Sequence, residues 1–346
     1  MMPAFVGGMI NLRGSLLPLL DLAARFGQAR GQFYYLIKHY KTAIGNENGE
    51  FKQSPSSGFI GIRSDGLKTQ ENYNMSSAVV LKNHEFNWIR DYLYKNTGIV
   101  LNDNKQALVT GRLDKRIRHL GFSSYSEYFK IFGTPGFEKE TMMAIDLLTT
   151  NETYFFREIK HFEFLKNKVF PEHALSKPLR IWSAASSSGE EAYTLAMLLA
   201  EYSKVSQWEI VGTDISTRVL DKARAGLYPM NATEKIPTPL LKKYCLRGSG
   251  EYEGFLLIDP ALRSRVKFVH ANLIGVLPNL GDFEVIFLRN VMIYFDTPTK
   301  QKLVAQIVKC LRPGGYFIIS HSESLNGIND QLSMVSPSIY RKPIDE

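Results

Sequence analysis

The sequence is poor in cysteine and has no apolar run long enough to cross a membrane. Its two cysteines, Cys245 and Cys310, lack the close spacing of a metal site, and two cysteines alone do not make a disulfide framework. No N-terminal stretch has the order of charged, apolar and small residues that marks a secretory signal. We therefore expect a cytoplasmic protein in a reducing compartment, not inserted in a membrane and without a bound metal ion.

Acidic residues are also too few to balance the basic ones. The chain has 42 lysines and arginines against 34 aspartates and glutamates, so its formal net charge is +8 at pH 7. This excess favours an acidic partner, and a carboxylate-rich protein surface satisfies it as well as nucleic acid does. A chain of 346 residues, of which 44% are hydrophobic, has room for about two domains with cores of their own.

Residues 1–80 lack the continuous pattern that a compact domain needs. Residues 5–27 are apolar, with strand-like runs on either side of Arg13. Residues 45–78 are rich in Gly, Ser, Asn, Gln and Lys, a composition typical of a linker or a disordered segment. We therefore expect the folded domains to begin after this region.

Two patterns follow in the rest of the chain. Between residues 81 and 150, apolar residues recur every three or four positions in about four segments, which predicts a small all-α domain. From 151 to 346, short apolar strands alternate with helices, which predicts an α/β domain of the Rossmann-like class with a late hairpin. Prolines and glycines interrupt this alternation at about residues 226–265, where we expect an inserted, mostly β, subdomain.

The α/β domain is organised around the stretch from Leu179 to Glu191. A short strand is followed by a run of small residues, by Gly189 and two glutamates, and then by an apolar helix. Small side chains let a ligand approach the backbone, and the start of a helix offers unpaired N–H groups. A phosphate-binding loop would be rich in glycine and free of acids, so these carboxylates favour a ligand with hydroxyl groups and a positive charge. By itself the stretch is equally compatible with an ordinary turn between a strand and a helix.

Other polar residues fall at the carboxyl ends of neighbouring strands, where ligands bind in an open α/β sheet. Asp214 ends the next strand, about twenty residues beyond the turn, where an acid can accept hydrogen bonds from both hydroxyls of a ribose. Asn272 follows a later strand and suits an adenine edge, and Arg289 and Asn290 follow another. S-adenosyl-L-methionine, a nucleoside with an amino acid and a sulfonium, fits this set better than a dinucleotide. The sequence therefore predicts a methyltransferase.

Six motifs follow one another in this part of the chain. They are Thr150-Asn-Glu-Thr-Tyr-Phe-Phe-Arg-Glu158, Trp182-Ser-Ala-Ala-Ser-Ser-Ser-Gly-Glu-Glu191, Thr213-Asp-Ile-Ser216, Arg289-Asn-Val-Met-Ile-Tyr-Phe295, Leu311-Arg-Pro-Gly-Gly315 and His321-Ser-Glu-Ser324. In content and order they resemble the CheR family of chemotaxis-receptor glutamate methyltransferases, over about residues 82–342. Residues 5–27 resemble part of the CheW-type coupling domain, but they are too few to close that fold, so we interpret them as a remnant.

The resemblance to the CheR family implies roles for individual residues. The cofactor, S-adenosyl-L-methionine, would be held by Asn151, Thr153, Arg157, Glu191, Asp214, Asn272, Leu273, Arg289 and Asn290. Arg157 would also hold the acceptor carboxylate and Tyr294 would align it. Transfer to a carboxylate that is already ionised needs no strong base, so catalysis would consist mainly of positioning and electrostatics. Alternatively, Arg157 is a salt-bridged linker residue and Tyr294 a core residue, and we interpret Glu190 as a solvated acid at the helix start.

A surface that docks the receptor is predicted on the helix at about residues 105–120. Asp114 is the only acid in this segment, so the segment is positively charged. A receptor helix that bears several glutamates would be complementary in charge to this segment. The basic residues beside the apolar stripe are Lys105, Arg112, Lys115 and Arg116. The glycine-rich segment 247–254 resembles the part of the family that pairs with a receptor's C-terminal peptide, although a hairpin without a partner fits equally well.

Two other functions stay open at this point. One is a methyltransferase that acts on RNA or on another protein, and the other is a non-catalytic adaptor in a chemosensory array. The sequence lacks the aromatic–proline motif typical of base-amine methylation, so we expect no nucleic-acid partner. The presence of Asn151, Arg157, Asp214 and Tyr294 argues against an inactive adaptor. We expect the protein to be a monomer.

Overall fold

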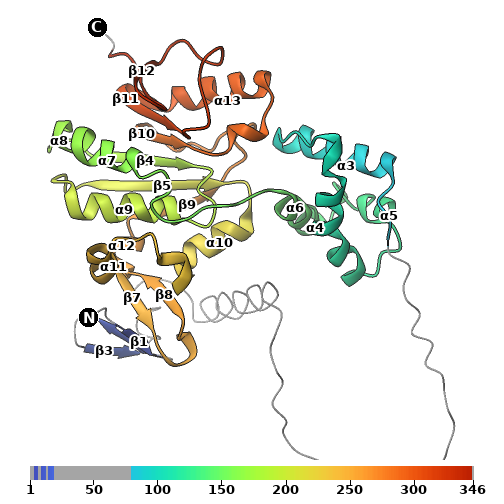
Figure 1. The fold of residues 1–346 in the computed structure, drawn as a ribbon, viewed down its shortest axis with the longest axis horizontal. Helices are drawn as coiled ribbons and strands as arrows, with labels where there is room; N and C mark the ends of the chain where they lie inside the picture. Colours follow the sequence, from blue (N-terminus) through green and yellow to red (C-terminus); the bar gives the residue numbers. More distant parts are fainter. Residues whose placement is uncertain (1–3, 7–8, 13–14, 19–78, 345–346) are drawn as a thin grey trace, which may run out of the picture.

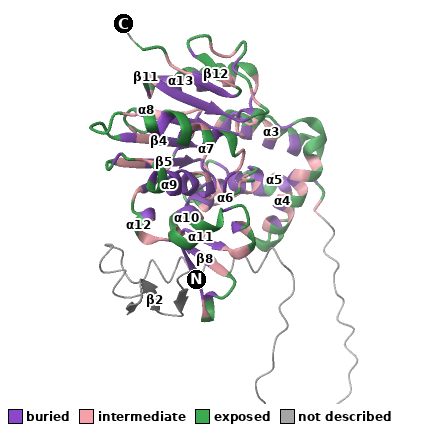
Figure 2. Ribbon diagram, turned by 60° about the vertical axis from the view of Figure 1, so that its left-hand side comes forward, coloured by how far each residue is buried: buried purple, intermediate pink, exposed green. Residues whose placement is uncertain are grey.

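The computed structural model describes residues 4–6, 9–12, 15–18 and 79–344. Figure 1 shows a helical domain beside a larger α/β domain, and a small sheet that includes strands near the N-terminus. Figure 2 shows that buried residues are concentrated in the large sheet and in the helices against it. Among the described residues, no helix combines the length and the apolar character that crossing a bilayer requires.

The helical domain forms as the apolar spacing predicts. Its helices are α3 (Asn83–Thr97), α4 (Gln106–His119), α5 (Tyr125–Phe129) and α6 (Glu138–Leu148). Ile89 on α3 and Leu113 on α4 are fully buried, because residues three or four positions apart share one face of a helix. Gly98 caps α3 just after its last residue, and its left-handed backbone (φ 74°) lets its N–H bond to the carbonyl of Tyr94.

The α/β domain is built on a seven-stranded sheet in the order β12-β13-β11-β10-β4-β5-β9. The five strands β11, β10, β4, β5 and β9 are parallel, and β12 and β13 form the hairpin that the sequence predicts. The strands are β4 (Leu179–Ala184), β5 (Trp208–Asp214), β9 (Val266–His270), β10 (Phe283–Leu288), β11 (Leu311–Ile319), β12 (Ser333–Ser336) and β13 (Ile339–Arg341).

Helices cover both faces of this sheet, as in other Rossmann-like domains. On β4, Ile181 packs with α7 (Lys160–Phe164) and α9 (Glu190–Tyr202), whereas the next residue, Trp182, packs with α13 (Thr297–Lys309) on the opposite face. Successive side chains of a strand point to opposite faces of the sheet. A strand that is buried on both faces therefore carries apolar residues at consecutive positions. This confirms the fold class predicted from the sequence.

The helical domain contacts the loops that follow β9 and β10. The Val100 N–H donates to the carbonyl of Tyr294 (2.9 Å), and Asn272 Nδ2 donates to the carbonyl of Asn96 (2.7 Å). Helix α6 also packs against α10 (Thr217–Ala225). The carboxyl ends of the parallel strands are therefore covered by the helical domain.

The inserted region contains three short strands, which belong to a second sheet, and two short α-helices. They are β6 (Leu227–Pro229), α11 (Thr238–Tyr244), β7 (Cys245–Gly248), β8 (Phe255–Ile258) and α12 (Pro260–Arg263). The sheet continues into β1 (Ala4–Val6), β2 (Met9–Leu12) and β3 (Ser15–Pro18), in the order β3-β2-β1-β7-β8-β6. Strands β2 and β3 are the runs expected on either side of Arg13, and β1 is parallel to β7. The predicted linker, residues 45–78, lies outside the described residues.

Candidate active site

The turn between β4 and α9 needs the small residues that the sequence supplies there. Ala185 and Ser187 have positive φ angles (67° and 49°), and Gly189 (φ 96°) precedes α9. A Cβ on Gly189 would lie 2.9 Å from the Cβ of Ala223, so a larger residue would force α10 away. Ala185 and Ser187 line a cavity, which places this tight turn at a binding site.

Asp214, the last residue of β5, is buried beside this turn with 6% of its surface exposed. Its Oδ2 accepts a hydrogen bond from the Ser187 N–H (2.9 Å), and its Oδ1 accepts one from the Ser216 N–H (2.9 Å). Burial raises the pKa of the Asp214 carboxyl, and the backbone N–H groups offset only part of that rise. Asp214 also lines the cavity, so its predicted role as an acceptor for two ribose hydroxyls is compatible with its position.

Glu191 and Arg289 form an ion pair on the same cavity (2.9 Å between Oε2 and Nη1). The Arg289 side chain is only 2% exposed, and the other Glu191 oxygen accepts a hydrogen bond from the Ser183 hydroxyl (2.7 Å). Glu191 lies in the first turn of α9, where the helix dipole favours a carboxylate. This end of the cavity is suited to a positively charged group.

The residues predicted to hold the cofactor all line this one cavity, which lies between the helical and α/β domains. They are Asn151, Thr153, Arg157, Glu191, Asp214, Asn272, Leu273, Arg289 and Asn290. Tyr294 and Lys105 line it too. Apolar residues of the helical domain that the sequence did not assign to a site also line it, namely Ile99, Val100, Leu101, Leu108 and Leu148. Sequence gives no signal for these, because they are spaced like ordinary core residues.

The side-chain amides of Asn272 and Asn290 are engaged by polar partners within the protein. Asn272 donates to the carbonyl of Asn96 and accepts from the Ile274 N–H (3.2 Å). Asn290 has a positive φ (58°) and donates to the hydroxyl of Ser320 (2.7 Å). Their amides therefore shape the wall of the cavity, and an adenine edge would compete with the partners that Asn272 has here.

Arg157, predicted to hold the acceptor, is half-buried on the cavity wall. Its guanidinium donates to the carbonyl of Glu152 (2.6 Å) and lies over the ring of Tyr154, 5.6 Å from its centre. Tyr294, predicted to align the acceptor, is half-buried on the same cavity. Both side chains thus line the same cavity as the predicted cofactor residues.

Comparison with known proteins identifies the family. A family described as "CheR methyltransferase, SAM binding domain" matches residues 151–341, and "CheR methyltransferase, all-alpha domain" matches residues 84–149. The chain belongs to the CheR methyltransferase family. Chemotaxis protein methyltransferase 2 of Pseudomonas aeruginosa is 41% identical over 260 residues, which cover 74% of this chain and 92% of that protein. The chemotaxis protein methyltransferase of Salmonella typhimurium is 35% identical over 269 residues, covering 77% and 92% of the two chains.

S-adenosylmethionine is the cofactor of this CheR-family chain. The side chains fit it: Asp214 offers an acceptor for a diol, and Glu191 offers a carboxylate for a cationic group. The turn before α9 has one glycine and is followed by two acids, so it does not suit a pyrophosphate.

The four basic residues predicted to dock the receptor differ in their surroundings. Arg112 donates to backbone carbonyls at the end of α6 (2.8 and 2.9 Å), and Arg116 forms an ion pair with Glu140. Both arginines thus hold the helical domain together, and they are less available to a receptor than the sequence suggests. Lys105 and Lys115 are exposed. A docking role here therefore rests on the two lysines, Lys115 on α4 and Lys105 directly before it.

Glu190 corrects the prediction of a solvated acid at the helix start. It is 7% exposed, and its carboxylate accepts from the Ser188 hydroxyl (2.8 and 3.0 Å). The inserted subdomain covers this point, since the Tyr228 hydroxyl on β6 donates to the carbonyl of Ser188 (2.6 Å). Burial raises the pKa of Glu190 to about 7. The position of the insert over the helix start could not be inferred from local sequence.

We expect Glu190→Gln to increase the free energy of unfolding at pH 8 by about 1–3 kcal/mol. The folded-state pKa is raised from its usual 4.5 to about 7, so the wild-type protein loses stability as the pH rises through this interval and the buried carboxyl ionises. The variant has no such group and should lack this loss. Urea midpoints measured between pH 5 and pH 8 check the prediction, with the exposed Glu163→Gln as the control. Parallel pH profiles for wild type and Glu190→Gln would contradict it.

Proposed function

We propose that this chain transfers the methyl group of S-adenosylmethionine to glutamate side chains on the cytoplasmic helices of chemoreceptors, as a cytoplasmic monomer. The products are glutamate methyl esters. One observation carries the proposal: the cofactor residues and both acceptor residues, Arg157 and Tyr294, line a single cavity. The relatives named chemotaxis protein methyltransferases support this choice of substrate.

The site has to position its acceptor and does not have to activate it. A glutamate carboxylate has a pKa of about 4.3 and is ionised at neutral pH, so no base is needed. S-adenosylmethionine supplies a methyl group that a sulfonium activates. The carboxylate oxygen bonds to the methyl carbon as the carbon–sulfur bond breaks, the electron pair goes to sulfur, and no proton moves. Arg157 holds the acceptor and Tyr294 aligns it, while the apolar residues of the helical domain exclude water.

Peptide mapping tests this proposal. The purified chain would be incubated with S-adenosylmethionine and the cytoplasmic fragment of a chemoreceptor, and the digested receptor would be analysed by mass spectrometry. We expect methyl groups on glutamates of the receptor helices. Methyl groups on lysine or arginine instead, or no transfer to any receptor, would overturn the proposed substrate.

We also propose that Lys105 and Lys115 contribute to receptor recognition. Reversing both to glutamate should slow methylation at low ionic strength by about three- to ten-fold and flatten its salt dependence, because exposed charges act mainly by steering the encounter. Rates measured over a salt series check this. Reversal of Lys309, exposed on α13, is the control and should leave the series unchanged. Normal rates for the double reversal at every salt concentration would remove this helix from substrate recognition.

The edge of β7 is the second proposed receptor contact, for a C-terminal receptor peptide that adds a strand to the sheet. In this structure β7 lies between β8 and β1, so an added strand would take the place of β1. A competing strand supplied by the chain itself would weaken binding of such a peptide.

Deleting residues 1–78 should leave kcat and cofactor affinity within about two-fold, since the helical and α/β domains have cores of their own. The same deletion frees the edge of β7, so binding of a receptor-tail peptide should become tighter. Steady-state kinetics and calorimetric titration of the peptide measure the two effects. An insoluble or inactive product would mean that the N-terminal strands belong to the catalytic fold.

A further inference from the structure

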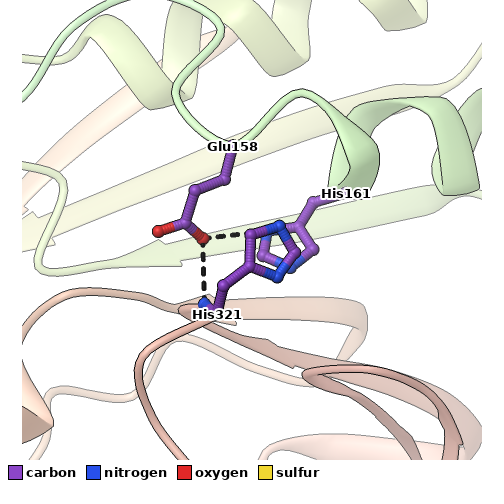
Figure 3. A group of neighbouring side chains, drawn as sticks. All are labelled: Glu158, His161 and His321. Atoms are coloured by element: carbon purple, nitrogen blue, oxygen red, sulfur yellow. Dashed lines mark hydrogen bonds and ion pairs between the residues drawn. The ribbon is translucent and has the colours of Figure 1, made fainter.

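Glu158 follows Arg157 in the chain but does not line the cavity. Figure 3 shows its carboxylate beside His161 and His321. Its Oε1 accepts from the Ser320 hydroxyl (2.9 Å), and its Oε2 accepts from the His321 N–H (3.2 Å) and is 3.2 Å from Arg289 Nη2. Burial opposes ionisation of this carboxyl, but Arg289 and the hydrogen bonds outweigh it and lower its pKa to about 2. Glu158 is therefore an anion at any physiological pH.

Glu158, His161 and His321 also have the spacing of metal ligands, with one ligand atom of each within 4.8 Å of the others (Figure 3). Burial, together with the nearby charge of Arg289, lowers the pKa of His161 to about 3, so its ring is neutral. A divalent cation bound here would lie beside the buried guanidinium of Arg289, which repels it. The arrangement therefore suits the ion pair of Glu158 with Arg289 and not a metal ion.

The guanidinium of Arg289 is shared between two carboxylates. Its Nη2 lies 3.2 Å from Glu158, and its Nη1 lies 2.9 Å from Glu191. One buried cation thus faces two anions, and the three side chains together carry one net negative charge. Glu191 lines the cavity and Glu158 does not. Of the two carboxylates, only Glu191 can therefore present the remaining negative charge to a ligand in the cavity.

We propose that Glu158, by pairing with Arg289, keeps Arg289 from fully neutralising Glu191. Glu191 thereby retains enough negative charge to bind the ammonium group of the cofactor's amino-acid arm. Without Glu158, Arg289 would pair with Glu191 alone and neutralise it. Glu158 does not touch the cofactor, so it is a positioning residue that selects for the amino-acid arm. This inference rests on the proposed function of the cavity as the site of S-adenosylmethionine.

Calorimetric titration of Glu158→Gln with three ligands tests the proposal. S-adenosylmethionine and S-adenosylhomocysteine carry the amino-acid arm, whereas methylthioadenosine has the same nucleoside and a thioether without that arm. We expect the variant to bind the first two about ten-fold more weakly, or about 1.4 kcal/mol, and methylthioadenosine within about two-fold of wild type. Glu323→Gln is the matched control, because Glu323 accepts from the N–H groups of Asn290 and Ser320 in the same loops. Any change that it causes should be equal for the three ligands.

An equal loss of affinity for all three ligands in Glu158→Gln would show that the residue only shapes the loops. No loss for any of them would show that Glu158 has no effect on how strongly Glu191 binds the ammonium group. Either result overturns the proposal. Should Glu158→Gln fail to fold, Glu158→Asp carries the test, because it keeps the negative charge but moves it away from Arg289, and its smaller loss should again be confined to the two ligands with the amino-acid arm. Where Glu158→Gln folds, combining it with Glu191→Gln should cause no larger loss than Glu191→Gln alone. These titrations need no receptor, so their failure is distinguishable from failure of receptor methylation.

Discussion

Replacing Asp214 with alanine should weaken the binding of S-adenosylmethionine by about 1–3 kcal/mol, roughly 5- to 150-fold in Kd. Two ribose hydroxyls would lose their shared acceptor in a buried site. The N–H groups of Ser187 and Ser216 would lose the carboxylate that now fixes the turn before α9. Both effects fall on cofactor binding, so calorimetric titration of the cofactor measures them directly.

Two further variants serve as controls. Asp214→Asn keeps one carbonyl oxygen as an acceptor, so it should retain more affinity than the alanine variant. Asp221→Ala removes an exposed acid from α10 and should leave the affinity unchanged. Wild-type affinity in Asp214→Ala would remove this residue from the cofactor site, even though it lines the cavity.

Replacing Arg157 with alanine should lower kcat by about 100-fold or more, because an oriented cation that holds the acceptor acts on the transfer step itself. Cofactor Kd should rise by less than about five-fold. Steady-state kinetics with a receptor fragment, together with titration of the cofactor, measure the two effects separately. Arg157→Lys keeps the charge without the planar fork, so it should recover only part of the rate.

The contacts that Arg157 makes with Glu152 and Tyr154 suggest how the alternative role would appear. A linker residue would lower thermal stability and leave kcat per folded molecule near wild type. Equal losses in kcat and in cofactor affinity would instead assign Arg157 mainly to cofactor binding.

The sequence predicted what depends on local pattern. The apolar stripes of α3 and α4 place Ile89 and Leu113 in the core of the helical domain, as their spacing requires. Polar residues at or just after the carboxyl ends of parallel strands meet at one edge of a sheet, so Asp214 and Arg289 could be assigned to one cavity before their contacts were known.

What the sequence could not show depends on partners far along the chain. Basic residues along a helix have the same spacing whether they face solvent or the carbonyls of another helix. The contacts of Arg112 with the end of α6 could therefore not be predicted from the sequence. Glu190 and Glu191 are adjacent acids at one helix start, yet the first is covered by the insert and the second lines the cavity. The pairing of β1 with β7 joins segments about 240 residues apart in the sequence and could not be inferred from either.

The most direct test of glutamate methylation is the fate of the transferred methyl group in alkali. The chain would be incubated with methyl-labelled S-adenosylmethionine and receptor-rich membranes, and the washed membranes would then be treated with base. Carboxyl methyl esters hydrolyse under these conditions, so we predict that the label leaves the receptor as methanol and that Asp214→Ala lowers its amount. Label that stays on the receptor after alkali, as methyl groups on nitrogen do, would contradict the account.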